Sequence, residues 1–251
     1  MTHKILILFA FCSLFFLSCD RSGFLTGPST NSTSNSGSLT FKLELKGGSN
    51  GSSELRFASS FDCTANGVNT VDVKVYYSTS SSPIASGSWL CLAHSGTISN
   101  VSASSGLNVV ILGKNPDGDI LYRGEQSGIT VTANQTTNVG TITVSNFIPT
   151  LVSPANNSTI SSLDFAWRSS VINYGLQISE SNTFSTLVGG AMTDINSATT
   201  SLMTLNPAGS KWYWRVRAVD SNGNVSKWSD MWSFTSAGIT NGLVTRTVTP
   251  G

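Results

Sequence analysis

The stretch that decides the fold is WYWRVRA at residues 212–218, in which large apolar side chains alternate with more polar ones. Successive side chains of a β-strand point to opposite faces of a sheet, so this alternation predicts a half-buried strand. We expect the even-numbered positions, from Trp212 to Ala218, to lie in a core. Tyr213, Arg215 and Arg217 then face outward.

The same alternation recurs on both sides of a short turn upstream of this strand. Phe165 and Trp167 are two residues apart, and Tyr174, Leu176 and Ile178 follow with the same spacing. Each set predicts a strand with one apolar face. We expect both faces to share a core with the even-numbered positions of residues 212–218.

Further motifs resemble a bacterial fibronectin type III domain and extend over residues 147–236. They are PTLVSPAN at 149–156, FAW at 165–167, YGLQIS at 174–179, WYWRVRA at 212–218, WS at 228–229 and WSF at 232–234. The resemblance implies a β-sandwich. This family usually has a tyrosine where the chain has Trp212, and the hydroxyl of that tyrosine bonds back to the preceding corner.

The outward residues Tyr213, Arg215 and Arg217 are expected beside Trp228 and Trp232. A stack of Trp and Arg side chains here resembles the Trp-Ser ladders of cytokine-receptor fibronectin domains, although WSDMWS at 228–233 is one residue longer. Two interpretations remain open. The stack is an aromatic platform for a sugar ring or peptide, or it stabilises the edge of the sandwich.

Two loops carry further candidate binding residues. Asn222 and Asn224 lie in a polar loop at an expected end of the sandwich, where such domains often bind partners. Asn115, Asp117 and Asp119 have the spacing of calcium ligands, but the glycine and the final glutamate of a calcium loop are missing. A tight hairpin turn is the stronger interpretation of this second loop, and calcium binding is the alternative.

Residues 38–146 show the same period of two. Leu39, Phe41, Leu43 and Leu45 alternate with polar residues. In the same way, Val71, Val73, Val75 and Tyr77 are expected on one face, against Asp72, Lys74 and Tyr76. Further strands are expected at 89–94, 107–114, 119–123, 128–132 and 139–144. Short strands at this spacing predict an antiparallel β-sandwich, and residues 106–144 resemble the closing hairpins of bacterial Ig-like or prealbumin-like domains. The expected fold class is therefore all-β, with two tandem sandwiches.

The first residues have the pattern of an export signal. Lys4 supplies a positive charge, and residues 5–18 form an apolar run of about 14 residues, enough for a signal peptide and too short for a membrane span. The run ends in FLSC at 16–19, which resembles the lipobox of bacterial lipoproteins. This implies cleavage before Cys19, and a diacylglycerol and an N-acyl chain on that cysteine. The alternative is an ordinary signal peptide, which would leave Cys19 as a free or paired thiol.

The two ends of the mature chain are expected to be loose. Residues 19–37 are rich in Ser, Thr, Asn and Gly and contain few large apolar side chains, which predicts a flexible tether. Residues 237–251 are expected to be a C-terminal tail, although Leu243 and Val244 could add to a sheet edge. With Cys12 removed and Cys19 acylated, Cys63 and Cys91 remain.

Two remaining cysteines in an exported protein favour a disulfide between Cys63 and Cys91. This bond would stabilise the fold by roughly 3 to 4 kcal/mol. Two buried free thiols are the alternative. A cysteine nucleophile is not expected, because His94 is the only histidine of the mature chain, and we expect it to be an ordinary strand residue.

Composition limits the classes of function. Charged residues make up 11% of the chain, with 14 basic and 13 acidic side chains, and loss of Lys4 with the signal balances the two. Such a chain has no net field to attract nucleic acid. Its scattered carboxylates and absence of a metal-ligand cluster argue against an enzyme, a metal site and a small-molecule substrate.

We therefore expect a non-catalytic lipoprotein, anchored in the cell membrane or outer membrane and presenting two β-sandwiches to protein or glycan partners, or serving as a spacer. A role as a surface adhesin fits this expectation. The alternatives are a carbohydrate-binding accessory module and a purely structural envelope component.

Overall fold

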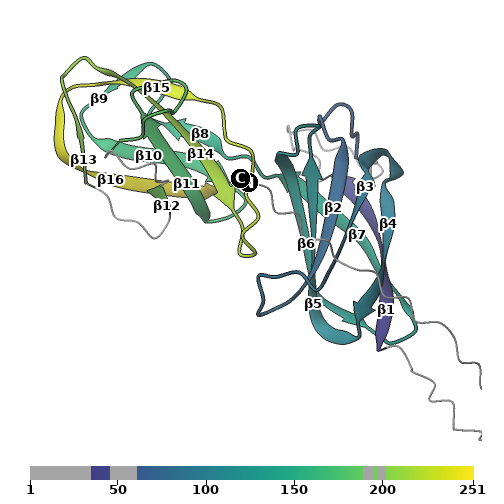
Figure 1. Ribbon diagram of the computed structural model, residues 1–251. Helices are drawn as coiled ribbons and strands as arrows, with labels where there is room; N and C mark the ends of the chain where they lie inside the picture. The colour runs from purple at the N-terminus through teal and green to yellow at the C-terminus, as the bar shows by residue number, and fades with distance from the viewer. Residues whose placement is uncertain (1–34, 46–60, 189–194, 197–201) are drawn as a thin grey trace, which may run out of the picture. The chain divides into compact units, whose positions relative to one another are not determined.

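A computed structural model describes residues 35–45, 61–188, 195–196 and 202–251. In these ranges the protein is all-β, as predicted, with strands in three sheets and a single 3-10 turn at Cys91–Ala93 (Figure 1). The signal peptide, Cys19 and nearly all of the expected tether lie outside the described residues. Among the described residues, no helix has the length and apolar character needed to cross a bilayer.

The N-terminal sheet region is one seven-stranded sheet with the order β3-β2-β5-β6-β7-β1-β4. Its strands are β1 (Ser36–Leu45), β2 (Thr70–Tyr77), β3 (Ala85–Leu90), β4 (Ser95–Ser102), β5 (Ser104–Lys114), β6 (Ile120–Val131) and β7 (Thr136–Asn146). All neighbouring strands are antiparallel except β1 and β7, which are parallel.

The predicted alternation of β1 and β2 produces the core of this region. Leu39, Phe41 and Leu43 are buried together with the valines of β2, while the side chain of Leu45 lies outside the described residues. The prediction for Tyr77 was wrong, because Tyr77 is 40% exposed and Tyr76 is 1% exposed. Tyr76 lies on the opposite face of β2, and that face is covered by a second apolar cluster.

Two predicted strand boundaries also differ. The strand expected at 89–94 ends at Leu90, because the chain turns through the 3-10 turn and His94 adopts a left-handed φ of 51°. A separate strand, β4, follows. The two strands expected at 119–123 and 128–132 are one strand, β6, which accommodates a shift in register by a positive φ at Gly128 instead of ending.

Cys63 and Cys91 form a disulfide, with their Cα atoms 5.8 Å apart. Cys91 begins the 3-10 turn, and Cys63 lies in the segment before β2. The bond therefore joins this segment to the end of β3, and both cysteines are buried in the core of the N-terminal sheet region.

The C-terminal sheet region contains two sheets with the orders β13-β16-β10-β8 and β12-β11-β14-β15-β9. Its strands are β8 (Thr150–Ser153), β9 (Ser158–Ile160), β10 (Leu163–Ser169), β11 (Asn173–Ser179), β12 (Ile195–Asn196), β13 (Leu202–Leu205), β14 (Lys211–Val219), β15 (Trp232–Ser236) and β16 (Ile239–Pro250).

Side chains of both sheets share one apolar core. Trp167 of β10 and Trp214 of β14 are fully buried there, and Phe165 packs edge-on against Trp214 with ring centroids 5.0 Å apart. Every core residue predicted for this region is buried. Ala218, at the end of β14, belongs to the second apolar cluster instead.

The segment expected to be a C-terminal tail forms β16. This strand runs parallel to β10 and antiparallel to β13, so it lies inside its sheet. Val244 is buried in the core and Val248 packs against it. The segment is a strand because Val244 and Val248 lie beside Leu163 and Trp167 of β10 and complete its apolar face. β10 is distant from this segment in the sequence.

Trp212 occupies the position where a tyrosine is usual, and its ring N–H replaces the hydroxyl. Nε1 of Trp212 donates to Oγ of Ser210 at 2.9 Å, and this hydroxyl donates to the carbonyl of Pro207 at 2.6 Å. Ser210 therefore connects Trp212 of β14 to the corner before the strand by two successive hydrogen bonds.

Candidate functional site

The predicted stack of arginine and tryptophan side chains is present beside β14. The guanidinium carbon of Arg215 lies 4.4 Å from the ring centroid of Trp228, and that of Arg217 lies 4.6 Å from the same centroid. Arg215 also lies 4.0 Å from the ring centroid of Phe184. We call these four residues the cation–π ladder.

Arg215 is further held by the neighbouring strand. Its Nε and Nη2 atoms donate to Oε1 of Gln177 at 2.9 Å and 2.7 Å, and Gln177 lies directly opposite Arg215 in the pairing of β11 with β14. Sequence reasoning missed both Gln177 and Phe184. Gln177 follows from the register, whereas Phe184 is a lone aromatic in a polar turn and carries no sequence signal.

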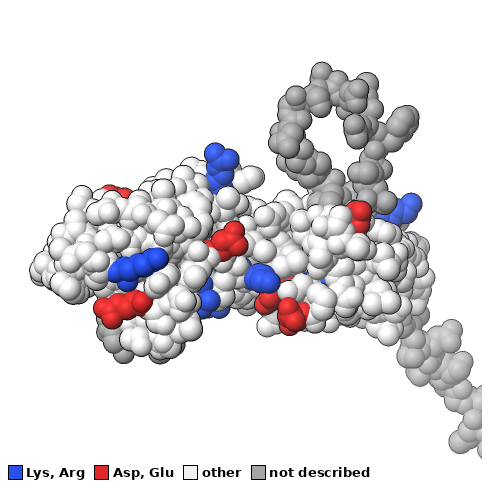
Figure 2. Space-filling view, turned by 90° about the horizontal axis from the view of Figure 1, so that it is seen from above, with Lys and Arg blue, Asp and Glu red and all other residues white. Residues whose placement is uncertain are grey.

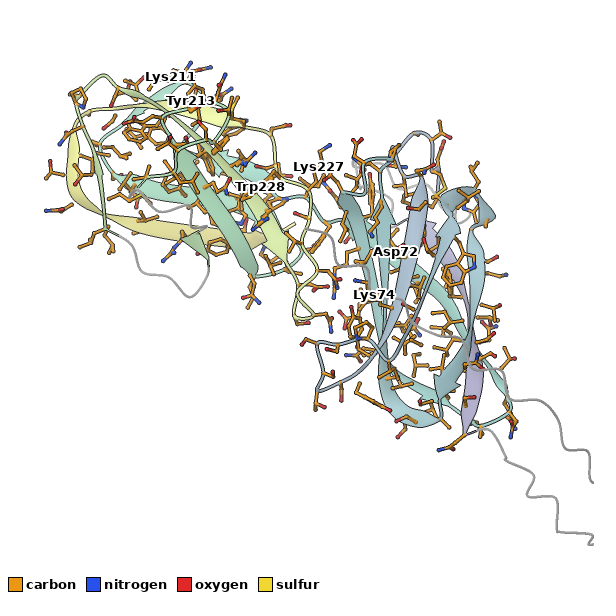
Figure 3. The ribbon with its side chains drawn as sticks, viewed as in Figure 1. Asp72, Lys74, Lys211, Tyr213, Lys227 and Trp228 are labelled. Carbon is orange, nitrogen blue, oxygen red and sulfur yellow. A yellow bond between two sulfur atoms is a disulfide. The ribbon has the colours of Figure 1, made fainter. Side chains whose placement is uncertain are left out.

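Two of the residues expected in the stack lie apart from it. Trp232 packs against Trp214 of the core with ring centroids 6.1 Å apart. The ring of Tyr213 is contacted by the ammonium group of Lys211, 5.5 Å from its centroid; Figure 3 labels Lys211, Tyr213 and Trp228. The ladder therefore contains Arg215, Arg217 and Trp228 but neither Tyr213 nor Trp232.

Two serines fix Trp228 over β14. Backbone N–H groups of Ser226 and Ser229 donate to the carbonyls of Ala218 and Val216. The serine hydroxyls accept from the N–H groups of the same two residues, at 2.9 Å and 3.0 Å. The segment 226–229 thus makes the backbone hydrogen bonds that a neighbouring strand would make to this edge of β14. Ser226 and Ser229 hold the indole of Trp228 between them.

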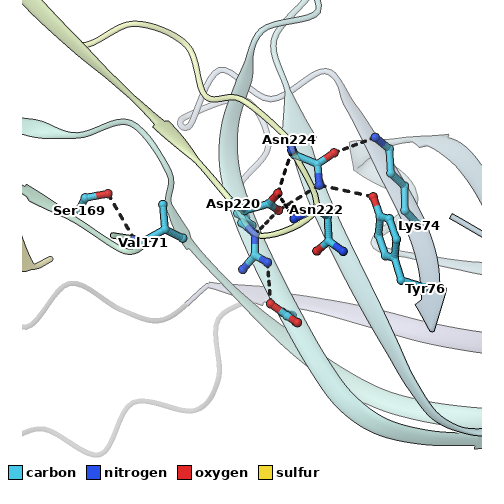
Figure 4. Close-up of polar contacts among 9 residues, drawn as sticks. Lys74, Tyr76, Ser169, Val171, Asp220, Asn222 and Asn224 are labelled. Carbon is cyan, nitrogen blue, oxygen red and sulfur yellow. Dashed lines mark hydrogen bonds and ion pairs between the residues drawn. The ribbon is translucent and has the colours of Figure 1, made fainter. Parts of the chain in front are cut away.

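The second predicted loop, 220–224, lies at the junction between the two sheet regions (Figure 4). The Asp220 side chain is 0% exposed, and its Oδ2 accepts from Nε of Arg123 at 2.7 Å and from Nδ2 of Asn224 at 2.9 Å. Its Oδ1 accepts from the backbone N–H groups of Asn222 and Asn224. This carboxylate is therefore paired and fully hydrogen-bonded.

Asn224 extends the network into the N-terminal sheet region. Its Oδ1 accepts from Nζ of Lys74 at 2.8 Å, and its Nδ2 lies 3.4 Å from the hydroxyl of Tyr76. Asn224 is buried, so it joins the two regions and is not offered to an external ligand. Figure 4 draws the contact of Lys74 with Asn224.

Burial changes the titration of the two groups that Asp220 influences. Burial raises the pKa of the Tyr76 hydroxyl, and the charge of Asp220 raises it further, against opposing effects of Asn224 and Arg123. Burial alone would lower the pKa of Arg123, but hydrogen bonds to Asp220 and Glu125 outweigh it and raise that pKa. Tyr76 therefore stays neutral and Arg123 stays charged at neutral pH.

The calcium-like loop forms a hydrogen-bonded turn. Oδ1 of Asn115 accepts from the backbone N–H of Asp119 at 2.8 Å, and its Nδ2 donates toward the carboxylates of Asp117 and Asp119. Gly118 supplies a positive φ of 88°. The oxygen that a calcium ion would need from Asn115 thus closes the turn, which favours the hairpin interpretation.

A groove of about 410 Å³ opens next to the ladder. Leu121, Asn146 and residues 148–151 line it, together with Lys227, Trp228, Asp230 and Trp232. The face shown in Figure 2 carries scattered charges of both signs with no extended area of one sign. Recognition in this groove therefore depends on its own few side chains.

Comparisons with known proteins return only distant structural similarity. Neither a family model nor a curated protein matches the sequence. A fimbrilin from Porphyromonas gingivalis W83 is 9% identical, with 76% of this chain and 73% of that chain covered and a TM-score of 0.30. A DUF4876 family protein from Bacteroides thetaiotaomicron VPI-5482 is 8% identical, with 79% and 46% covered and a TM-score of 0.25.

Proposed function

We propose that this protein is an exported bacterial lipoprotein, anchored through acyl chains on Cys19, that acts without catalysis as a rigid spacer presenting two β-sandwich domains. The second domain is of the fibronectin type III kind. The lipid anchor places the protein at the cell membrane or outer membrane, where it serves as a surface adhesin or envelope spacer. The observation that carries the proposal is the junction between the two sheet regions.

The connection across the junction is too short and too well packed to be a hinge. β7 ends at Asn146 and β8 begins at Thr150, and Phe147 between them is fully buried. Phe147 packs in an apolar cluster with Tyr76, Val110, Leu112, Ile120 and Ala218. Motion between domains is the usual expectation unless their interface is apolar and extensive, and this interface has an apolar centre.

Polar contacts surround that centre. Ile120 and Ser226 form a parallel bridge, and the N–H of Lys227 donates to the carbonyl of Ile120 at 2.9 Å. The ion pair of Arg123 and Asp220 completes the junction. Its buried charges have strict geometry, so they specify one arrangement of the two regions.

The same contacts support a non-catalytic role. Arg123 and Asp220 form a buried charged pair, with side chains 12% and 0% exposed, and each is engaged by the other and by its neighbours. A catalytic acid or base must be able to reach a substrate. These groups instead stabilise the junction.

The alternative of a carbohydrate-binding module receives less support from the ladder. A sugar platform needs an aromatic face that is open to the ligand, but two guanidinium groups already contact the ring of Trp228. The ladder therefore fits stabilisation of the sheet edge.

Anchoring is tested by metabolic labelling with an alkyne-tagged palmitate, comparing the natural chain with Cys19→Ala. We expect label on the natural chain alone and accumulation of the uncut precursor when lipoprotein signal peptidase is inhibited. Proteinase K treatment of intact cells then tests surface exposure. Unlabelled natural protein would overturn the anchor, and complete protection from protease would overturn the adhesin role.

A further inference from the structure

The edge of β8 is available for strand pairing. β8 is the last strand of its sheet and pairs with β10 on one side. No other strand in the described ranges pairs with its second side. An unpaired strand edge presents backbone N–H and C=O groups that an extended peptide can bond.

The groove described above includes the first residues of this strand. Thr150 and Leu151 of β8 line it together with Trp228 and Trp232. A peptide strand bonded to β8 would therefore have its side chains beside two indole rings. Apolar pockets next to a free edge give a bound strand its sequence preference.

The two indoles are positioned to contact an apolar side chain and not to stack with a sugar. Trp228 is contacted by the guanidinium groups of Arg215 and Arg217, and Trp232 packs against Trp214. Both rings still line the groove. Both side chains are half-buried, so each still offers apolar surface that suits an aliphatic or aromatic side chain.

Charge in the groove favours a basic residue next to that side chain. The ammonium of Lys227 lies 3.5 Å from the carboxylate of Asp119 and is neutralised by it. The carboxylate of Asp230 also lines the groove and is exposed, and it forms no ion pair within the part of the chain that the structure describes. Asp230 is thus the uncompensated charge of the groove.

We propose that the groove along β8 binds an extended peptide segment of a partner protein, which adds a strand to β8, places an apolar side chain against Trp228 and Trp232, and pairs a neighbouring Lys or Arg with Asp230. This rests on the proposed function, because it names the partner class of the presented module. The anchor is not needed for peptide binding, so the two proposals can fail separately.

The test uses the full chain in detergent and a displayed library of random ten-residue peptides as the probe. Thr150→Arg places a bulky cation on the exposed face of β8 and blocks the groove, and Asp230→Asn removes its charge. Thr159→Arg is the matched control, because Thr159 is an exposed threonine on the edge strand β9. Thermal melting checks that all three variants fold.

We expect selected peptides to pair an apolar residue with an adjacent Lys or Arg. Thr150→Arg should weaken their binding by about tenfold or more, Asp230→Asn by roughly threefold, and Thr159→Arg by less than about twofold. Hydrogen exchange at the β8 amides should slow when peptide binds.

Three results would overturn the proposal. One is a library that enriches no peptide against the folded protein. Another is enriched peptides that bind the natural chain and Thr150→Arg equally well. The third is a glycan on a glycan array whose binding, in place of peptide binding, is abolished by Thr150→Arg.

Discussion

Asp220 places a buried carboxylate at the junction of the two sheet regions. Its carboxylate accepts four hydrogen bonds. Two come from backbone N–H groups of its own loop, one from the side-chain amide of Asn224, and one from Arg123 of the other sheet region. A buried charge of this kind is tolerated only while its partners remain in place. The sequence pointed to Asn222 and Asn224 as binding residues, whereas Asn224 is buried in this network and Asn222 contributes its backbone N–H to it.

Replacement of Asp220 by Ala should leave the Arg123 guanidinium buried without its main partner. We expect the free energy of unfolding to fall by about 3 to 5 kcal/mol, measured by urea denaturation. The double variant Arg123→Met with Asp220→Asn is the control: it removes both charges but keeps an amide oxygen for the loop N–H groups, so it should recover most of this loss. A loss below about 1 kcal/mol for Asp220→Ala would show that the ion pair is not an essential part of the junction.

Trp228 contributes through its contacts with two arginines. Trp228→Ala should therefore reduce the free energy of unfolding by about 1 to 2 kcal/mol from the cation–π contacts, in addition to the lost packing. Tyr213→Ala is the comparison, because Tyr213 lies on the same face of β14 outside the ladder. Equal losses for the two variants would contradict a stabilising ladder.

Tyr76 should make stability sensitive to alkaline pH. Its pKa in the folded protein is raised above the ordinary value of 10.0, so the folded state holds the phenolic proton more tightly than the unfolded chain. Its contribution is complete below pH 10 and is lost as the pH rises through the folded pKa. Urea denaturation between pH 8 and pH 11 should show this decline, and Tyr76→Phe should make it less steep, because burial also raises the pKa values of Tyr122 and Tyr174. An equally steep decline in Tyr76→Phe would contradict the assignment.

At the scale of elements, the sequence predicted strands with strict alternation well. β1, β10, β11 and β14 bury the faces that their patterns indicate. It failed where a strand is defined by a distant partner. β16 is rich in Thr and has few large apolar residues, and its pairing with β10 cannot be read locally. Phe184 could not be predicted as part of the ladder for the same reason, because only the folded turn brings it to Arg215.

β16 should be essential to the core of the C-terminal sheet region, although its residues come last in the sequence. Val244→Asp places a carboxylate in this core, and we expect a loss of about 3 kcal/mol or more in the free energy of unfolding. Thr247→Asp, on the exposed positions of the same strand, is the matched control and should change stability by less than about 0.5 kcal/mol. If Val244→Asp behaves like the control, β16 is not part of the sheet in solution.

At the scale of the whole molecule, the proposed spacer role depends on the junction as a fixed connection. The short link through Phe147, the apolar cluster and the Asp220 network all act on the same two sheet regions. The sequence indicated two regions and their boundary near residue 147, but nothing local signalled that they would pack together. Tyr76 and Ala218, which fit the period of their strands, gave no sign that their faces would meet.

The most direct measurement of this account is ¹⁵N relaxation across both sheet regions, which reports how each region tumbles in solution. A rigid junction predicts one rotational correlation time shared by β1–β7 and β8–β16, and two separate, shorter times after Asp220→Ala. Two independent correlation times in the natural chain would show that the regions move freely, and that result would contradict the rigid spacer.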